Sequence, residues 1–87
     1  MGISIVTKDN CPWCIKAKEL LKSHNFNYRE INVPFSLSRE EFHTLAEKYH
    51  TTKTVPKIFD GNTLVGGYED LVDWVENHNG GFGKGAL

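Results

Sequence analysis

Apolar positions divide the first third of the chain into strand-like and helix-like stretches. Residues 2–7 form a short, largely β-branched apolar run, which predicts a strand buried on both faces. Apolar side chains then recur at helical spacing over residues 14–21, and this helix should end near residues 23–25. Residues 26–33 again have the pattern of a strand. This succession predicts a βαβ unit whose parallel strands are joined by a right-handed crossover.

The clearest helical period of the chain lies in its middle. Ser38 and Glu41 have the spacing of a capping box, which marks a helix N-terminus. Apolar residues follow at i, i+3, i+4 and i+7, namely Phe42, Leu45, Ala46 and Tyr49. The sequence therefore predicts a second helix with one apolar face.

A hairpin and a third helix are predicted for the last part. Two β-prone runs, residues 57–59 and 63–65, flank Asp60-Gly61-Asn62, which is a good hairpin turn. Gly66-Gly67 then breaks the hairpin, and a helix should run from Tyr68 to about residues 79–81. The order β-α-β-α-β-β-α predicts one α/β domain over residues 1–79. Residues 80–87 are glycine-rich with little to bury, so we expect a flexible tail.

The composition of the chain argues against nucleic acids and membranes as binding partners. A formal net charge of −1 gives no basic footprint for nucleic acid or for an anionic membrane. No apolar run approaches the ~20 residues that a bilayer span needs. The N-terminal residues also lack the basic segment and the long apolar segment of a secretory signal. We therefore expect a cytoplasmic protein that binds neither nucleic acid nor membrane.

The candidate chemistry lies in Cys11-Pro12-Trp13-Cys14, which holds the only two cysteines. The motif follows the first strand, and Pro12 suits the first position of a helix. A disulfide between residues so close in sequence constrains the unfolded chain little, so its contribution to stability is small. A structural zinc site needs four ligands, and one Cys-x-x-Cys with four scattered histidines lacks that spacing. The pair therefore points to a redox centre rather than to a metal site.

Cys11 is the expected nucleophile, at the N-cap of the first helix, with Cys14 shielded one turn later. A free thiol has a pKa near ~8.5, and lowering it to ~5 takes about 4.8 kcal/mol. The helix dipole supplies only about 0.3–2 kcal/mol of this. The amides of Trp13 and Cys14 and a nearby cation, for which Lys8 is the candidate, must supply the remainder.

Three separated motifs together resemble the small dithiol glutaredoxins of the thioredoxin-like superfamily. They are Cys11-Pro12-Trp13-Cys14, Thr54-Val55-Pro56 and Gly66-Gly67-Tyr68-Glu69-Asp70, and the likeness covers residues 3–78. The resemblance implies a thioredoxin-like fold with a four-stranded mixed sheet, in the order 2-1-3-4, flanked by three helices. It also implies catalysis by Cys11 and Cys14 without a metal or bound cofactor, with glutathione as the reducing co-substrate.

The resemblance further implies a glutathione groove along the second motif. Pro56 would be cis and lie against the active-site disulfide, while Thr54 and Val55 would hold the cysteinyl backbone in antiparallel pairing. Trp13 stands where the family more often has tyrosine, and its ring would cover the site and stack on glutathione.

The third motif would bind the γ-glutamyl end of glutathione. The Tyr68 amide would bind the γ-glutamyl carboxylate, and Glu69 and Asp70 would face the ammonium group. Glu69 is longer than the residue often found there in the family. Lys8, with Lys57 as a further candidate, would meet the glycyl carboxylate.

The implied function is glutathione-dependent reduction of protein disulfides and of glutathione mixed disulfides by a monomer. Its protein partners would be disulfide-bearing or glutathionylated proteins, with ribonucleotide reductase as a client by analogy. Two alternatives stay open at this point. One is a glutaredoxin-like carrier reduced by thioredoxin reductase, and the other is a dimer that bridges an iron–sulfur cluster through Cys11 and glutathione. Pro12 and the Tyr68-Glu69-Asp70 segment favour the glutathione-dependent enzyme.

Overall fold

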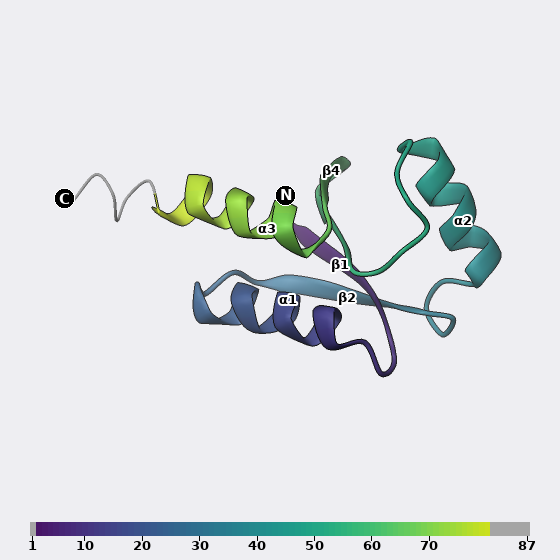
Figure 1. Ribbon diagram of the computed structural model, residues 1–87, viewed down its shortest axis with the longest axis horizontal. Helices are drawn as coiled ribbons and strands as arrows, with labels where there is room; N and C mark the ends of the chain where they lie inside the picture. Colours follow the sequence, from purple (N-terminus) through teal and green to yellow (C-terminus); the bar gives the residue numbers. More distant parts are fainter. Residues whose placement is uncertain (1, 81–87) are drawn as a thin grey trace.

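A four-stranded mixed sheet forms the centre of the protein in a computed structural model that describes residues 2–80 (Figure 1). Its strands are β1 (Ile3–Lys8), β2 (Tyr28–Val33), β3 (Lys57–Asp60) and β4 (Thr63–Gly66). They lie in the order β2-β1-β3-β4. β1 pairs with β2 in parallel and with β3 antiparallel, and β3 and β4 form an antiparallel hairpin. The predicted sheet order and strand directions are confirmed.

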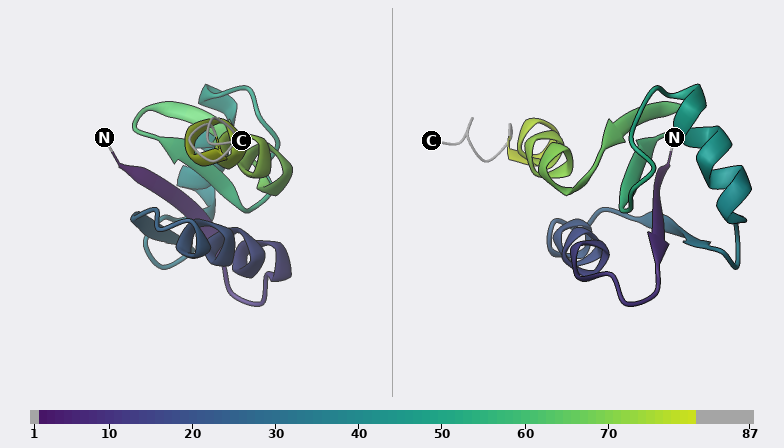
Figure 2. Two further views of the ribbon diagram at one scale, coloured as in Figure 1. Left: turned by 90° about the vertical axis from the view of Figure 1, so that its left-hand side faces the viewer. Right: turned by 45° about the vertical axis from the view of Figure 1, so that its right-hand side comes forward.

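Helices cover both faces of this sheet. They are α1 (Pro12–Ser23), α2 (Arg39–Lys48) and α3 (Tyr68–Val75). Figure 2 shows α1 and α3 on one side of the sheet and α2 on the other. Within residues 2–80, no helix has both the length and the apolar character that a membrane crossing requires.

Two apolar clusters hold the layers together, one on each face of the sheet. The larger cluster contains the buried residues Ile3, Ile5, Ala17, Leu21, Ile58, Leu71 and Val75, and thus joins α1 and α3 to the sheet. The smaller cluster contains Val6, Val33, Phe42 and Phe59, and thus joins α2 to the opposite face. Ile5 and Val6 are both fully buried and belong to different clusters, since successive side chains of a strand point to opposite faces.

The end of α1 explains why the second strand is shorter than predicted. Asn25 has a positive φ of 62°, and its amide donates to the Lys22 carbonyl at 3.0 Å. The Phe26 amide donates to the Leu21 carbonyl at 2.9 Å. This pair of bonds is a Schellman ending, with asparagine in the left-handed position where glycine is more common. Phe26 therefore closes the helix, and β2 begins only at Tyr28.

The predicted N-terminus of the second helix is confirmed in atomic detail. The Glu41 amide donates to Ser38 Oγ at 3.0 Å, and the Ser38 amide donates to Glu41 Oε1 at 2.9 Å. The hydrogen bond from the Ser38 amide to the Glu41 carboxylate, and then the nearby Ser38 hydroxyl, lower the pKa of Glu41. The capping box thus fixes where α2 starts.

The third helix changes geometry before its predicted end. α3 stops at Val75, and residues Glu76–Gly80 continue as a π-helical segment, η1. The helical segment thus ends where it is predicted to end, near residues 79–81, but its last turn is π-helical instead of α-helical. Gly80, placed in the predicted tail, belongs to η1, and the remainder of that tail, residues 81–87, lies outside the described residues.

A polar link ties β1, β2 and α1 together around Glu30. The buried Thr7 hydroxyl donates to Glu30 Oε2 at 2.6 Å, and Lys18 Nζ lies 3.1 Å from the same oxygen. The hydrogen bond from Thr7 and then the contact with Lys18 lower the pKa of Glu30 from its ordinary value of 4.5, although burial opposes them.

This link predicts a modest acid-dependent loss of stability. Because the folded-state pKa of Glu30 is depressed, its stabilisation is present above pH 4.5 and is lost as the pH falls through the folded value. Glu30 is partly exposed, so Glu30→Gln should lower the free energy of unfolding at pH 7 by less than about 1 kcal/mol. Urea unfolding at pH values between 7 and 3 gives the free energy of unfolding, which should change less with pH for Glu30→Gln than for Glu19→Gln. Equal slopes for the two variants would count against the link.

Candidate active site

The two cysteines lie at the start of α1, directly after the loop that leaves β1. Asn10 has a positive φ of 58° and turns the chain so that Cys11 becomes the N-cap residue. The Cys14 amide donates to Cys11 Sγ at 3.2 Å, and a disulfide joins the two residues. Cys11 and Cys14 are 6% and 2% exposed, respectively. The predicted placement of Cys11 at the helix N-cap and of Cys14 on the shielded face is confirmed.

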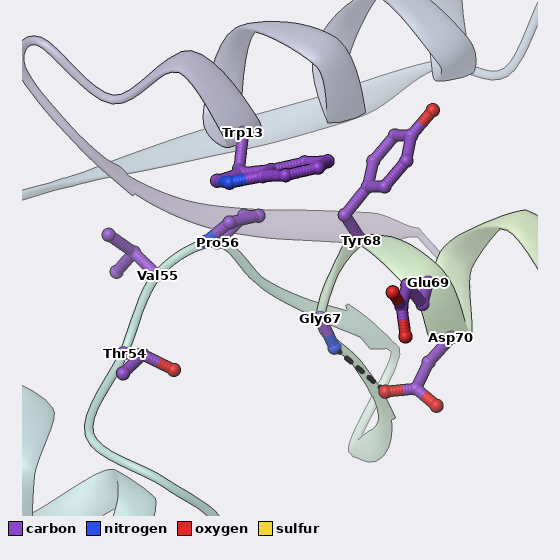
Figure 3. A pocket seen from close by; sticks show the side chains of 8 residues that line it. All are labelled: Trp13, Thr54, Val55, Pro56, Gly67, Tyr68, Glu69 and Asp70. Atoms are coloured by element: carbon purple, nitrogen blue, oxygen red, sulfur yellow. Dashed lines mark hydrogen bonds between the residues drawn. The ribbon is translucent and has the colours of Figure 1, made fainter.

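A cavity of about 280 Å³ lies beside this helix start (Figure 3). It brings together all three motifs of the sequence, and its lining residues are Trp13, Thr54, Val55, Pro56, Gly67, Tyr68, Glu69 and Asp70. Seven of these are residues for which we predict contact with glutathione. The eighth, Gly67, belongs to the third motif but has no predicted contact with glutathione; it provides the N-cap of α3.

Trp13 is an exposed aromatic wall of this cavity. Its side chain is 52% exposed, so it is not a core residue. Figure 3 shows the indole over Pro56, next to the ring of Tyr68. The centroids of the Trp13 and Tyr68 rings are 5.4 Å apart, and Lys16 Nζ lies 4.8 Å from the centroid of the indole. By contrast, Trp74 packs against Phe26 at the larger apolar cluster.

Val55 offers backbone hydrogen-bonding groups to the cavity. The Val55–Pro56 peptide bond is cis, which confirms the expected isomer. Within residues 2–80, neither Thr54 nor Val55 takes part in a backbone–backbone hydrogen bond. An extended ligand that pairs with Val55 would satisfy its N–H and C=O, which otherwise depend on water.

The N-terminus of α3 forms the opposite wall. The Gly67 amide donates to Asp70 Oδ2 at 3.1 Å, so one oxygen of this carboxylate caps the helix from within. The amides of Tyr68 and Glu69 lie in the first turn, where a helix has no internal acceptors. Such amides and the helix dipole together favour an anion. The arrangement therefore presents amide donors for an anion beside two acidic side chains.

Lys57 does not reach the cavity as a free cation. It is only 4% exposed, and its ammonium donates to Thr52 Oγ1 at 2.9 Å and to Thr54 Oγ1 at 3.3 Å. Burial lowers the pKa of Lys57, while the nearby charge of Asp70 acts in the opposite direction. These contacts do not favour the expected role of Lys57 as a partner of a substrate carboxylate, which stays a prediction. The residue instead braces the segment that carries Thr54.

Lys8 borders a second, larger cavity of about 470 Å³. Its lining residues are Lys8, Val33, Arg39, Phe42, His43, Lys53, Thr54 and Val55. Thr54 and Val55 thus line both cavities. Arg39 and Lys53 were missed by the sequence analysis because they belong to no motif, and only the fold places α2 beside Lys8. Among the described residues, no group of three His, Cys, Asp or Glu side chains has the arrangement of a metal site.

Comparisons with known proteins place these features in a family. The family model described as Glutaredoxin matches residues 3–65. Glutaredoxin 1 of Rickettsia prowazekii is 46% identical over 69 residues, which cover 79% of this chain and 72% of the relative. A protein of Clostridium pasteurianum, described as an uncharacterized glutaredoxin-like 8.6 kDa protein in the rubredoxin operon, is 41% identical over 66 residues. That match covers 74% of this chain and 83% of the relative.

Solved structures agree with the sequence matches. The solution structure of glutaredoxin from Brucella melitensis has a TM-score of 0.69 at 32% identity, and the match covers 90% of this chain and 80% of that one. The crystal structure of a buckwheat glutaredoxin–glutathione complex has a TM-score of 0.70 at 20% identity, over 90% of this chain and 69% of that one. This second likeness shows the fold alone. The chain belongs to the glutaredoxin family of thiol–disulfide oxidoreductases, and its Cys11–Cys14 pair has the spacing of the family's redox centre.

Proposed function

We propose that this protein uses glutathione to reduce disulfides of proteins and mixed disulfides of glutathione. The observation that carries the proposal is the cavity beside the redox helix. It combines an aromatic wall at Trp13, the amide-rich start of α3 and the backbone of Val55, which pairs with no other backbone group in the described part of the chain. These groups match an extended tripeptide with a carboxylate and an ammonium group at one end. A buckwheat glutaredoxin with the same fold has been solved as a complex with glutathione, which supports glutathione as the ligand.

The reaction follows from the position of the two sulfurs. In the reduced protein, the Cys11 thiolate attacks the glutathione sulfur of a mixed disulfide, and the other thiolate leaves and takes a proton. A second glutathione then attacks the glutathione sulfur bound to Cys11, which releases oxidised glutathione and regenerates Cys11. With a protein disulfide, Cys11 first forms a mixed disulfide with one client sulfur, and the other client sulfur leaves as a thiolate and is protonated. Cys14 then attacks Cys11, which releases the second client thiol and forms the Cys11–Cys14 disulfide. Two glutathione molecules reduce this disulfide in turn, through a mixed disulfide at Cys11, and leave as oxidised glutathione.

Each group of the cavity has a defined role in this proposal. Val55 pairs with the cysteinyl backbone, and the Tyr68 amide binds the γ-glutamyl carboxylate. Glu69 and the free oxygen of Asp70 face the ammonium group. Lys8, at the far side of Thr54 and Val55, meets the glycyl carboxylate. Ribonucleotide reductase is proposed as a client only on the resemblance to the family.

A coupled assay tests the choice of reductant. NADPH oxidation is followed with the mixed disulfide of glutathione and 2-mercaptoethanol as substrate, once with glutathione and glutathione reductase and once with thioredoxin reductase alone. We expect turnover only in the first arm. Turnover with thioredoxin reductase alone would instead indicate the carrier function, and visible absorbance after anaerobic purification would indicate an iron–sulfur protein.

The same assay tests the aromatic wall. Trp13→Ala should raise the KM for the glutathione mixed disulfide about 3- to 10-fold, since an aromatic contact contributes about 0.5–1.5 kcal/mol. Ile15→Ala is the matched control, because Ile15 is equally exposed on the same helix and does not line the cavity. An equal effect of the two substitutions would exclude Trp13 as a substrate contact.

A further inference from the structure

The two cavities share Thr54 and Val55 in their linings, and we treat them together as one substrate groove with charges of opposite sign at its two ends. Thr54 and Val55 border both cavities and thus form the middle of this substrate groove. We call the side of Glu69 and Asp70 the acidic end. The side of Lys8, Arg39, His43 and Lys53 is the basic end.

Some of these charges are more available to a ligand than others. Lys8 and Arg39 are exposed, and neither forms an ion pair with another side chain within residues 2–80. Lys53 Nζ lies 3.4 Å from Glu47 Oε2, which offsets part of its charge. At the other end, Glu69 is exposed, whereas Asp70 also caps α3 and lies near Lys57. The charge difference between the two ends therefore depends mainly on Lys8, Arg39 and Glu69.

The basic end is larger than a terminal carboxylate requires. Its volume of about 470 Å³ exceeds the 280 Å³ of the acidic end. Its floor includes the nearly buried side chains of Val33 and Phe42, which are 8% and 5% exposed. A cavity of this size with an apolar floor and a cationic rim suits the side chains of a longer peptide.

The backbone of the groove sets the direction of such a peptide. An antiparallel residue opposite Val55 exchanges both of its backbone hydrogen bonds with Val55 itself. A parallel residue there would need the Thr54 carbonyl and the N–H of the next residue, which is Pro56 and has none. Lys53 borders the basic end and Pro56 the acidic end, so an antiparallel chain runs from the acidic end to the basic end.

We propose that the substrate groove selects client disulfides by charge order. The preferred client presents the attacked cysteine in an extended segment with basic residues before it and acidic residues after it. This inference rests on the proposed placement of substrate along Val55. In the step concerned, the Cys11 thiolate attacks the client sulfur, a Cys11–client disulfide forms, and the second sulfur of the client disulfide leaves as a thiolate and is protonated.

Two short peptides of identical composition test the charge order. One has the sequence Ala-Lys-Lys-Cys-Glu-Glu-Ala and the other Ala-Glu-Glu-Cys-Lys-Lys-Ala, each with its cysteine as a 2-pyridyl disulfide. Attack on the peptide sulfur by the reduced Cys14→Ser variant releases 2-thiopyridone, which is followed by absorbance. Because net charge and composition are equal, only the order differs. We expect the first peptide to react roughly tenfold faster at low salt, with the ratio falling towards one in 1 M salt.

Charge variants in the same background assign the preference to the groove. Arg39→Glu and Glu69→Lys should each reduce the rate ratio at least about threefold, whereas Lys22→Glu, in the last turn of α1, should leave it unchanged. Equal rates for the two peptides, or a faster second peptide, would overturn the inference.

A control separates this inference from the proposed function, because the same Cys14→Ser protein is also assayed with the small glutathione mixed disulfide. No turnover of the glutathione mixed disulfide would contradict the proposed function. Normal turnover together with equal peptide rates would contradict only the charge selection.

Discussion

Replacing Cys11 with serine should lower every exchange reaction of this protein by at least ~10³-fold, because a hydroxyl cannot substitute for the thiolate nucleophile. The fold should be preserved, since Cys11 is the N-cap of α1 and serine is a preferred N-cap residue. The coupled glutathione assay measures the loss, and thermal unfolding of the reduced proteins verifies the fold. Full activity of Cys11→Ser would show that the nucleophile has been assigned to the wrong sulfur.

Cys14→Ser is the informative counterpart to that variant. Cys14 is shielded and needed only to release a client that is bound through Cys11. This variant should therefore keep reduction of the glutathione mixed disulfide and lose reduction of protein disulfides. Loss of both reactions would mean that Cys14 is also required in the glutathione step.

Gly66→Ala should destabilise the protein by about 2–4 kcal/mol and weaken binding of substrate in the cavity. Gly66 has a φ of +128°, a region that side chains rarely adopt, and such strain amounts to about 1–3 kcal/mol. A Cβ at this position would also lie 2.6 Å from Asp70 Cγ and 2.7 Å from Asp70 Cβ. Asp70 would have to move and give up the Gly67 amide, which adds about 1 kcal/mol.

The neighbouring glycine provides a matched control for this prediction. Gly67 has an extended backbone, with φ −90° and ψ −159°, and a Cβ there would meet only the Pro56 carbonyl oxygen at 3.8 Å. Urea unfolding should therefore show a large loss for Gly66→Ala and a change within about 0.5 kcal/mol for Gly67→Ala. Equal losses would show that the two glycines do not differ as their backbones indicate.

The sequence predicted the architecture well because its local signals agree with one another. The capping box at Ser38, the hairpin turn at Gly61 and the apolar periods each specify an element that the structure contains. Three motifs also predicted one site, and seven of the eight residues assigned to glutathione border one cavity. Their contacts with glutathione itself stay predictions.

The remaining features depend on tertiary packing that no short pattern encodes. Lys57 follows a motif proline and has the charge of a surface residue, but its neighbours in the fold bury it against Thr52 and Thr54. The Val33–Pro34 bond is cis, and nothing in the apolar pattern distinguishes it from an ordinary loop. Arg39 reaches the site only because α2 crosses the far face of the sheet. These features result from contacts between helices, strands and loops, not from the local sequence of any one of them.

The two apolar clusters on opposite faces of the sheet separate the packing of the redox helix from the packing of α2. Helices α1 and α3, which carry the cysteines and the acidic end, pack on the larger cluster, whereas α2 packs on the smaller one. Surface substitutions on α2 can therefore alter the charge of the basic end without disturbing the packing between α1 and α3. Under the proposed charge selection, substitutions on α2 would change client preference and leave the redox centre intact.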